Sequence, residues 1–123
     1  MIAKLQCVVL DCPDARALAR FYGALLGGAV NRPDPRWAVG DDFTTVHLGS
    51  GLVLAFQRVA EFRAPQWPGA EHPQQFHLDF DVPDLDEAEK QVLDLGATLL
   101  HADSRGWRVY ADPAGHPFCL LKG

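Results

Sequence analysis

Two short stretches of the chain, Asp11-Cys12-Pro13-Asp14 and Asp81-Val82-Pro83-Asp84, carry the pattern that decides the fold. Each follows a run of strand-like composition and precedes a helical pattern that ends at a glycine. The second stretch begins 70 residues after the first (81 − 11). Because the segments that follow the two joints also match, we infer a duplicated module.

The residues around each joint predict the order strand, helix and three strands. Apolar side chains three and four residues apart form one helical stripe in each half: Leu18, Phe21, Tyr22, Leu25 and Leu26, then Leu85, Ala88, Val92 and Leu95. Asp84 and Glu87 predict a capping box at the start of the second helix. The expected strands cover residues 2–11, 29–39, 44–48, 52–58, 75–82, 98–102, 107–111 and 117–122.

These elements predict an α+β protein built from two tandem βαβββ modules. The length of 123 residues suits one compact domain spanning residues 1–123. Module 1 is expected at about residues 1–59 and module 2 at about 74–123. Residues 60–73 hold three prolines and one glycine, which is typical of a linker.

Composition excludes several classes of function. The formal net charge of −5 argues against nucleic acid, whose phosphates need a basic surface. No apolar run approaches the length of a membrane span, and the N-terminal residues resemble a strand more than a signal peptide. Three cysteines do not form a disulfide framework, so we expect a protein of the reducing cytoplasm.

Strand alternation around residues 76–81 separates an apolar face from a polar one. Phe76, Leu78 and Phe80 share one face, and His77, Asp79 and Asp81 share the other. His77 and Asp79 are therefore candidate catalytic residues, as an acid/base pair, or a polar contact for a bound molecule. The alternative is that the two aspartates lie at a solvent-exposed rim.

The chain resembles the vicinal oxygen chelate superfamily of glyoxalases, bleomycin-resistance proteins and ring-cleaving dioxygenases. The matching strings are Val9-Leu10-Asp11, Phe21-Tyr22, Leu25-Leu26-Gly27, Phe76-His77-Leu78-Asp79-Phe80 and Asp112-Pro113-Ala114-Gly115-His116-Pro117-Phe118. Small actinobacterial-type glyoxalase-like proteins are the most similar group. The resemblance implies a cup-shaped mixed sheet with helices on its convex side, a ligand or metal on its concave side, and a homodimer.

The resemblance also implies four metal-ligand positions, which fall on Cys7, Ala55, His77 and Cys119. Enzymes of the superfamily place histidine or glutamine and two glutamates there, and this sequence retains His77 alone. No family-type metal is therefore expected. Zinc held by Cys7, His77, Cys119 and a water is one alternative; the other is that the cysteines are small buried apolar residues.

Aromatic and polar residues elsewhere are candidates for ligand binding. Trp37, Trp67 and Trp107 lie in or beside loops, where they stack on a flat ligand or fill a core or dimer interface. Gln57 shares the strand face of Ala55 and is expected to bond a ligand. Arg108 and Tyr110 share one strand face, which either contacts an anionic or polar group or faces solvent.

Three functions remain open from the sequence. The first is a small-molecule binding protein with a degenerate metal site. The second is a lyase, isomerase or dioxygenase that uses His77 and Asp79, with or without zinc. The third is an interaction module whose cup is filled by its own side chains.

Overall fold

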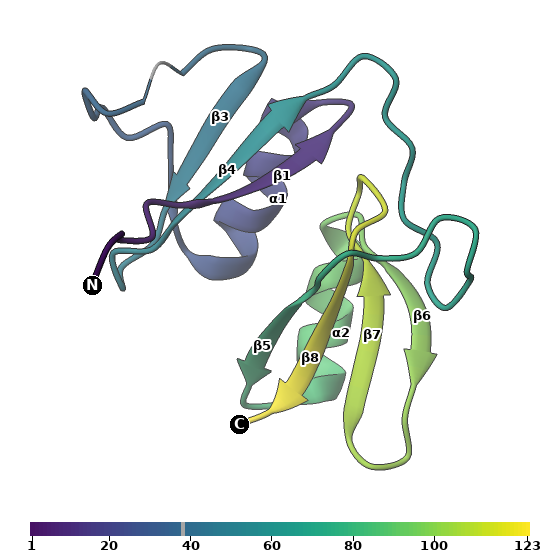
Figure 1. The fold of residues 1–123 in the computed structure, drawn as a ribbon. Coiled ribbons are helices and arrows are strands. Elements are labelled where there is room, and N and C mark those ends of the chain that lie inside the picture. Colours follow the sequence, from purple (N-terminus) through teal and green to yellow (C-terminus); the bar gives the residue numbers. More distant parts are fainter. Residues whose placement is uncertain (38) are drawn as a thin grey trace. The chain divides into compact units, whose positions relative to one another are not determined.

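The computed structural model describes residues 1–37 and 39–123, and the chain divides into two compact units (Figure 1). Unit 1 spans Met1–Phe62 and unit 2 spans Arg63–Gly123. The boundary falls inside the segment 60–73 expected as a linker, and most of that segment belongs to unit 2.

Unit 1 contains one helix and a four-stranded mixed sheet. Its elements are β1 (Val8–Cys12), α1 (Ala15–Leu26), β2 (Ala29–Val30), β3 (Phe43–His47) and β4 (Val53–Arg58). The strand order is β1-β4-β3-β2, with β1 parallel to β4 and the other pairs antiparallel.

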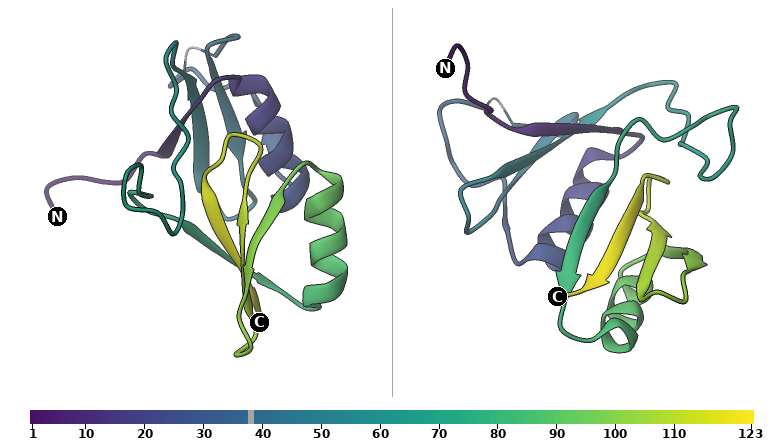
Figure 2. Two further views of the ribbon diagram at one scale, coloured as in Figure 1. Left: turned by 90° about the vertical axis from the view of Figure 1, so that its right-hand side faces the viewer. Right: turned by 60° about the horizontal axis from the view of Figure 1, so that its bottom comes forward.

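Unit 2 repeats this arrangement with β5 (Leu78–Val82), α2 (Leu85–Asp94), β6 (Thr98–Ala102), β7 (Trp107–Ala111) and β8 (Pro117–Lys122). The strand order β5-β8-β7-β6, with β5 parallel to β8, matches that of unit 1. Each helix lies across one face of its own sheet (Figure 2). The expected α+β class and the repeated order of one strand, a helix and three strands are confirmed.

The duplicated joints work as helix N-caps. The Asp14 side chain accepts a hydrogen bond from the backbone N–H of Ala17, and the Asp84 side chain accepts one from Glu87. This satisfies one free donor at the start of each helix. The expected capping box is only half formed, because the Glu87 carboxylate accepts a bond from Gln91.

Three expected strands are shorter than the sequence predicts. The strand expected at 75–82 begins at Leu78, so His77 lies just before it. The first expected strand begins at Val8, and residues 1–6 before it are exposed. The expected strand 29–39 is reduced to Ala29–Val30, because Pro33 and Pro35 lack the N–H that a ladder needs; Ala38 of that range lies outside the described residues.

The core of each unit lies between its helix and its sheet. In unit 1, Tyr22 of α1 stacks on Phe56 of β4 at 5.6 Å between ring centroids. In unit 2, Tyr110 of β7 stacks on Phe118 of β8 at 5.4 Å, and all four rings are buried. Each packed helix therefore leaves the opposite face of its sheet to carry functional side chains.

Across the part of the chain that the structure describes, neither helix combines the length and apolar character that crossing a membrane would require.

Candidate functional site

A pocket of about 390 Å³ lies in unit 2. Its size falls in the range of small-molecule sites. Nine residues line it: Trp67, Gln74, His77, Asp79, Trp107, Val109, Pro117, Cys119 and Leu121. The site therefore combines two tryptophans, several apolar side chains and a small polar group.

Strand register explains why these side chains meet. Cys119 in β8 is flanked by Asp79 in β5 and by Val109 in β7. Residues directly opposite each other across strands project to the same face of a sheet. The alternate residues, which include Phe80 and Phe118 with rings 5.9 Å apart, project to the helix side. The pocket thus belongs to the sheet face opposite α2.

His77, Asp79 and Cys119 form the polar part of the pocket. Nε2 of His77 lies 3.3 Å from Oδ1 of Asp79, and one nitrogen, oxygen and sulfur atom from the three residues lie within 4.8 Å of one another. The His77 side chain is 41% exposed and that of Asp79 is 55% exposed, so a ligand can reach both.

The environment of Cys119 keeps its thiol protonated. Burial, the negative charge of Asp79 and a hydrogen bond to that carboxylate together raise the pKa of Cys119 to about 11. A thiol is a poor nucleophile until it ionises. The arrangement therefore gives Cys119 the role of hydrogen-bond donor or metal ligand, and not that of an activated nucleophile.

The three donor atoms fit zinc better than manganese or magnesium. Zinc accepts imidazole, thiolate and carboxylate ligands in a tetrahedral site, whereas manganese and magnesium prefer several oxygen ligands. His77, Asp79 and Cys119 would hold the ion and leave a fourth position open. The set differs from the one expected from the sequence, since it contains Asp79, while Cys7 belongs to unit 1.

The duplication provides an internal comparison. Asp79 pairs with Cys119 in unit 2 as Val9 pairs with Ala55 in unit 1. Ala55 and Cys119 thus occupy equivalent backbone positions, as the resemblance implies. The positions that carry a carboxylate and a thiol in unit 2 carry two apolar side chains in unit 1, so the polar group is a feature of one unit only.

His101, a residue to which the sequence analysis assigned no role, packs near both Trp67 and Trp107. The ring of His101 lies 6.0 Å from that of Trp67 and 5.6 Å from that of Trp107, tilted by 57° and 50°. His101 is opposite Val109, which lines the pocket. The register of β6 shifts between Leu99 and His101, which interrupts the strand alternation, so no periodic signal in the sequence places His101 beside the pocket.

Gln74 is a second lining residue that the sequence analysis missed. Its Oε1 atom is buried and, among the described residues, has no hydrogen-bond partner. Gln74 comes just before β5, in a segment without a regular pattern. No signal in the sequence marks it out from its neighbour Gln75.

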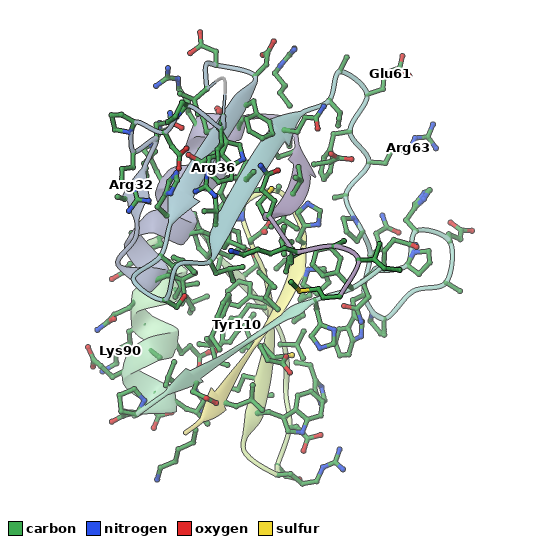
Figure 3. All side chains as sticks on the ribbon, turned by 60° about the vertical axis from the view of Figure 1, so that its left-hand side comes forward. Arg32, Arg36, Glu61, Arg63, Lys90 and Tyr110 are labelled. Atoms are coloured by element: carbon green, nitrogen blue, oxygen red, sulfur yellow. The ribbon has the colours of Figure 1, made fainter. Side chains whose placement is uncertain are left out.

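Trp37 and Gln57 belong to unit 1 and do not line this pocket. The Trp37 ring packs edge-on against the buried His47 at 5.3 Å, and the guanidinium of Arg36 lies 4.4 Å from the Trp37 ring centroid. Figure 3 labels Arg36 beside the strands of unit 1. Gln57 is exposed near the end of β4.

Arg108 and Tyr110 lie on the other face of the sheet, so the expectation that they contact a ligand in this pocket is corrected. Arg108 bonds α2 through Asp86 (2.7 Å), Glu89 and the Leu85 carbonyl (3.4 Å), and these carboxylates raise its pKa. Tyr110, labelled in Figure 3, is buried against Phe118, and burial raises the pKa of its hydroxyl. Arg108 thus ties β7 to α2, and Tyr110 packs within the core of unit 2.

A family model described as a glyoxalase-like domain matches residues 7–121. No curated protein sequence matches the chain. Among solved structures, the fosfomycin resistance protein FosX from Mesorhizobium loti is similar, with 15% identity, a TM-score of 0.71 and coverage of 100% of this chain and 94% of that one.

Two further solved structures share the fold. A glyoxalase/bleomycin resistance protein/dioxygenase family enzyme from Burkholderia phytofirmans is 20% identical, with a TM-score of 0.68 and coverage of 96% and 97%. An E126Q mutant of FosX from Listeria monocytogenes, complexed with Mn(II) and 1S,2S-dihydroxypropylphosphonic acid, is 15% identical, with a TM-score of 0.69 and coverage of 100% and 92%. At sequence identities of 15–20%, the similarity to these structures shows a shared fold alone.

Proposed function

Because this chain belongs to the glyoxalase-like domain family of the vicinal oxygen chelate superfamily, we propose that it binds a small, flat molecule in the pocket of unit 2. The observation that carries the proposal is the placement of Trp67 and Trp107 on one pocket with His77, Asp79 and Cys119. Two indole rings supply apolar contact area, and the polar group supplies orientation.

Physical arguments favour a ring-shaped ligand. Stacking on an aromatic side chain contributes about 0.5–1.5 kcal/mol beyond the area it buries. The rings of Trp67 and Trp107 are both held against His101, so little side-chain entropy is lost when a ligand contacts them. Val109, Pro117 and Leu121 extend the apolar lining.

The proposal is tested by isothermal titration of the full chain with a set of flat aromatic and heteroaromatic molecules. Trp67→Ala and Trp107→Ala should each weaken a bound molecule by about tenfold or more. Trp37→Ala is the matched control, since Trp37 belongs to unit 1. Equal affinities for the wild type and both pocket variants, with unchanged melting curves, would refute the proposal.

A second candidate function is catalysis with zinc, and one observation favours it. Nitrogen, oxygen and sulfur donors of His77, Asp79 and Cys119 lie within 4.8 Å of one another. Bound zinc would polarise a substrate oxygen and has no redox chemistry, which suits a lyase or isomerase better than a dioxygenase. Without zinc, the His77–Asp79 pair can hold or accept a proton beside a bound substrate.

The catalytic candidate is tested by turnover of glyoxals, catechols and epoxides with metal-free and zinc-loaded protein. His77→Ala should abolish turnover while the circular dichroism spectrum stays unchanged. If neither form of the wild-type protein turns over any of the three classes, the binding function is retained and the catalytic one is abandoned.

Homodimerisation, expected from the resemblance, is part of the proposal. β6 is an edge strand in unit 2, and Leu99 and Leu100 on it are each 39% exposed. An edge with exposed apolar residues favours association. Light scattering on the purified chain should give twice the monomer mass, and a monomer mass across the working concentration range would contradict it.

A further inference from the structure

We propose that the ligand of the unit 2 pocket is a flat aromatic cation, such as an amidine or a protonated heteroaromatic amine, whose N–H groups bond Asp79 and Gln74. This inference rests on the proposed binding function and names the chemical class that the pocket accepts. Three independent features of the lining support it.

The first feature is the unpaired acceptor of Gln74. Its Oε1 atom is buried in the part of the chain that the structure describes and receives no hydrogen bond. A buried acceptor without a partner is unfavourable, and a donor on the ligand would relieve that cost. Gln74 lines the same pocket as Asp79, so one ligand with two N–H groups can address both.

The second feature is the charge of the lining. Asp79 is the one acidic residue among the nine that line the pocket, and no lysine or arginine is among them. The lining therefore carries a carboxylate and offers an anion neither an ammonium nor a guanidinium group.

Arg105, which lies beside Trp107, does not change this balance. Arg105 lies 5.8 Å from the Trp107 ring centroid but is paired with Asp103 through its Nε at 2.9 Å. His101 is also within 3.7 Å of the Asp103 carboxylate. The guanidinium beside Trp107 is thus matched by a carboxylate of its own.

The third feature is the pair of indole rings. The face of tryptophan carries negative electrostatic potential and attracts a cation, more strongly where the cation is desolvated. A flat cation gains this term as well as stacking on Trp67 and Trp107. A neutral ring of the same size gains the stacking alone.

The test uses three probes of the same shape and different charge: benzamidine, benzamide and benzoate. Titration calorimetry or ligand-observed NMR on the full chain should rank benzamidine first, then benzamide, then benzoate. We expect benzamidine to bind at least about tenfold more tightly than benzoate, with dissociation constants for these fragments on the order of millimolar.

Two variants assign the preference to the named acceptors. Asp79→Asn should weaken benzamidine by about tenfold and bring its affinity close to that of benzamide. Gln74→Leu should weaken both N–H-bearing probes by a few-fold. The matched controls are Asp81→Asn, on the same side of β5 and outside the pocket lining, and Gln75→Leu, whose side chain is exposed.

The outcomes separate this inference from the proposed function. If the three probes bind equally and Trp67→Ala weakens all of them, the binding function stands and the cation preference is refuted. If benzoate binds best, the charge argument is wrong. If none of the probes binds at about 20 mM, both the inference and the proposed site are overturned for flat ligands of this size.

Discussion

Nε2 of His77 lies 3.3 Å from Oδ1 of Asp79, and both side chains line the pocket of unit 2. Register places Cys119 directly opposite Asp79, which completes a group of three donor atoms. In unit 1, the positions equivalent to Asp79 and Cys119 carry Val9 and Ala55. At these two positions, therefore, unit 1 lacks the carboxylate and the thiol that unit 2 carries.

Removal of Asp79 distinguishes between two zinc sites. If zinc binds His77, Asp79 and Cys119, then Asp79→Asn should weaken zinc by about tenfold or more, because an anionic oxygen ligand is lost. Cys7→Ala should leave zinc binding unchanged. Competition titration with a colorimetric chelator measures both. Loss of zinc in Cys7→Ala with retention in Asp79→Asn would instead favour the set Cys7, His77 and Cys119.

Alkylation of Cys119 should depend on pH in a defined direction. Since its pKa is about 11, the thiolate fraction and the alkylation rate should rise about tenfold per pH unit from neutral pH to about pH 10, without a plateau. Asp79→Asn removes a negative charge and a hydrogen bond that favour the thiol, so the rate at pH 8 should increase. Iodoacetamide labelling with peptide mass spectrometry measures this.

The control for this experiment is Asp81→Asn, which removes an exposed carboxylate from the same side of β5. Its Cys119 peptide should be labelled at the wild-type rate. A plateau in the wild-type rate below pH 9, or equal rates in Asp79→Asn and wild type, would contradict the environment described for Cys119.

His101 is a positioning residue that acts through the two tryptophans. His101→Ala should weaken a flat ligand by a few-fold and alter the near-ultraviolet circular dichroism of the tryptophans, because both rings lose the side chain they pack on. His101→Phe should restore affinity, since a ring is retained. His72→Ala is the histidine control. Wild-type ligand affinity in His101→Ala would show that His101 does not contribute to ligand binding.

Arg108 should contribute to stability and not to binding. Arg108→Met removes the bonds that tie β7 to Asp86, Glu89 and the Leu85 carbonyl. We expect a loss of about 1 kcal/mol in the free energy of unfolding, a modest figure because the Asp86 carboxylate is largely exposed. Chemical denaturation measures the loss, and titration should give wild-type ligand affinity. A large loss of ligand affinity in Arg108→Met would contradict this assignment and indicate that Arg108 contributes to binding.

The sequence predicts the fold because its signals are local. Each signal can be read from a short segment of the chain. These signals are the cap residues Asp14 and Asp84, the apolar helical stripes and the strand alternation. The shared face of His77 and Asp79 follows from the same alternation. The cause of the shortened strand at 29–39 is local as well, because Pro33 and Pro35 lie within the expected strand itself.

The rest of the site depends on contacts that local patterns do not encode. In β7, Trp107, Val109 and Ala111 form the apolar face, yet the face of Arg108 and Tyr110 is the one that meets α2, so alternation alone does not predict which face packs on the helix. The pairing of β7 and β8 settles it, because Val109 is opposite Cys119. Trp67 and Gln74 reach the pocket from an irregular segment, whose path has no periodicity to read.

The most direct test of the central claim is an NMR titration that follows the three tryptophan indole N–H resonances. Addition of a flat aromatic ligand should shift the indole signals of Trp67 and Trp107 at the same midpoint and leave that of Trp37 in place. Shifts confined to Trp37, or saturable binding with both pocket signals unmoved, would contradict a ligand site between Trp67 and Trp107.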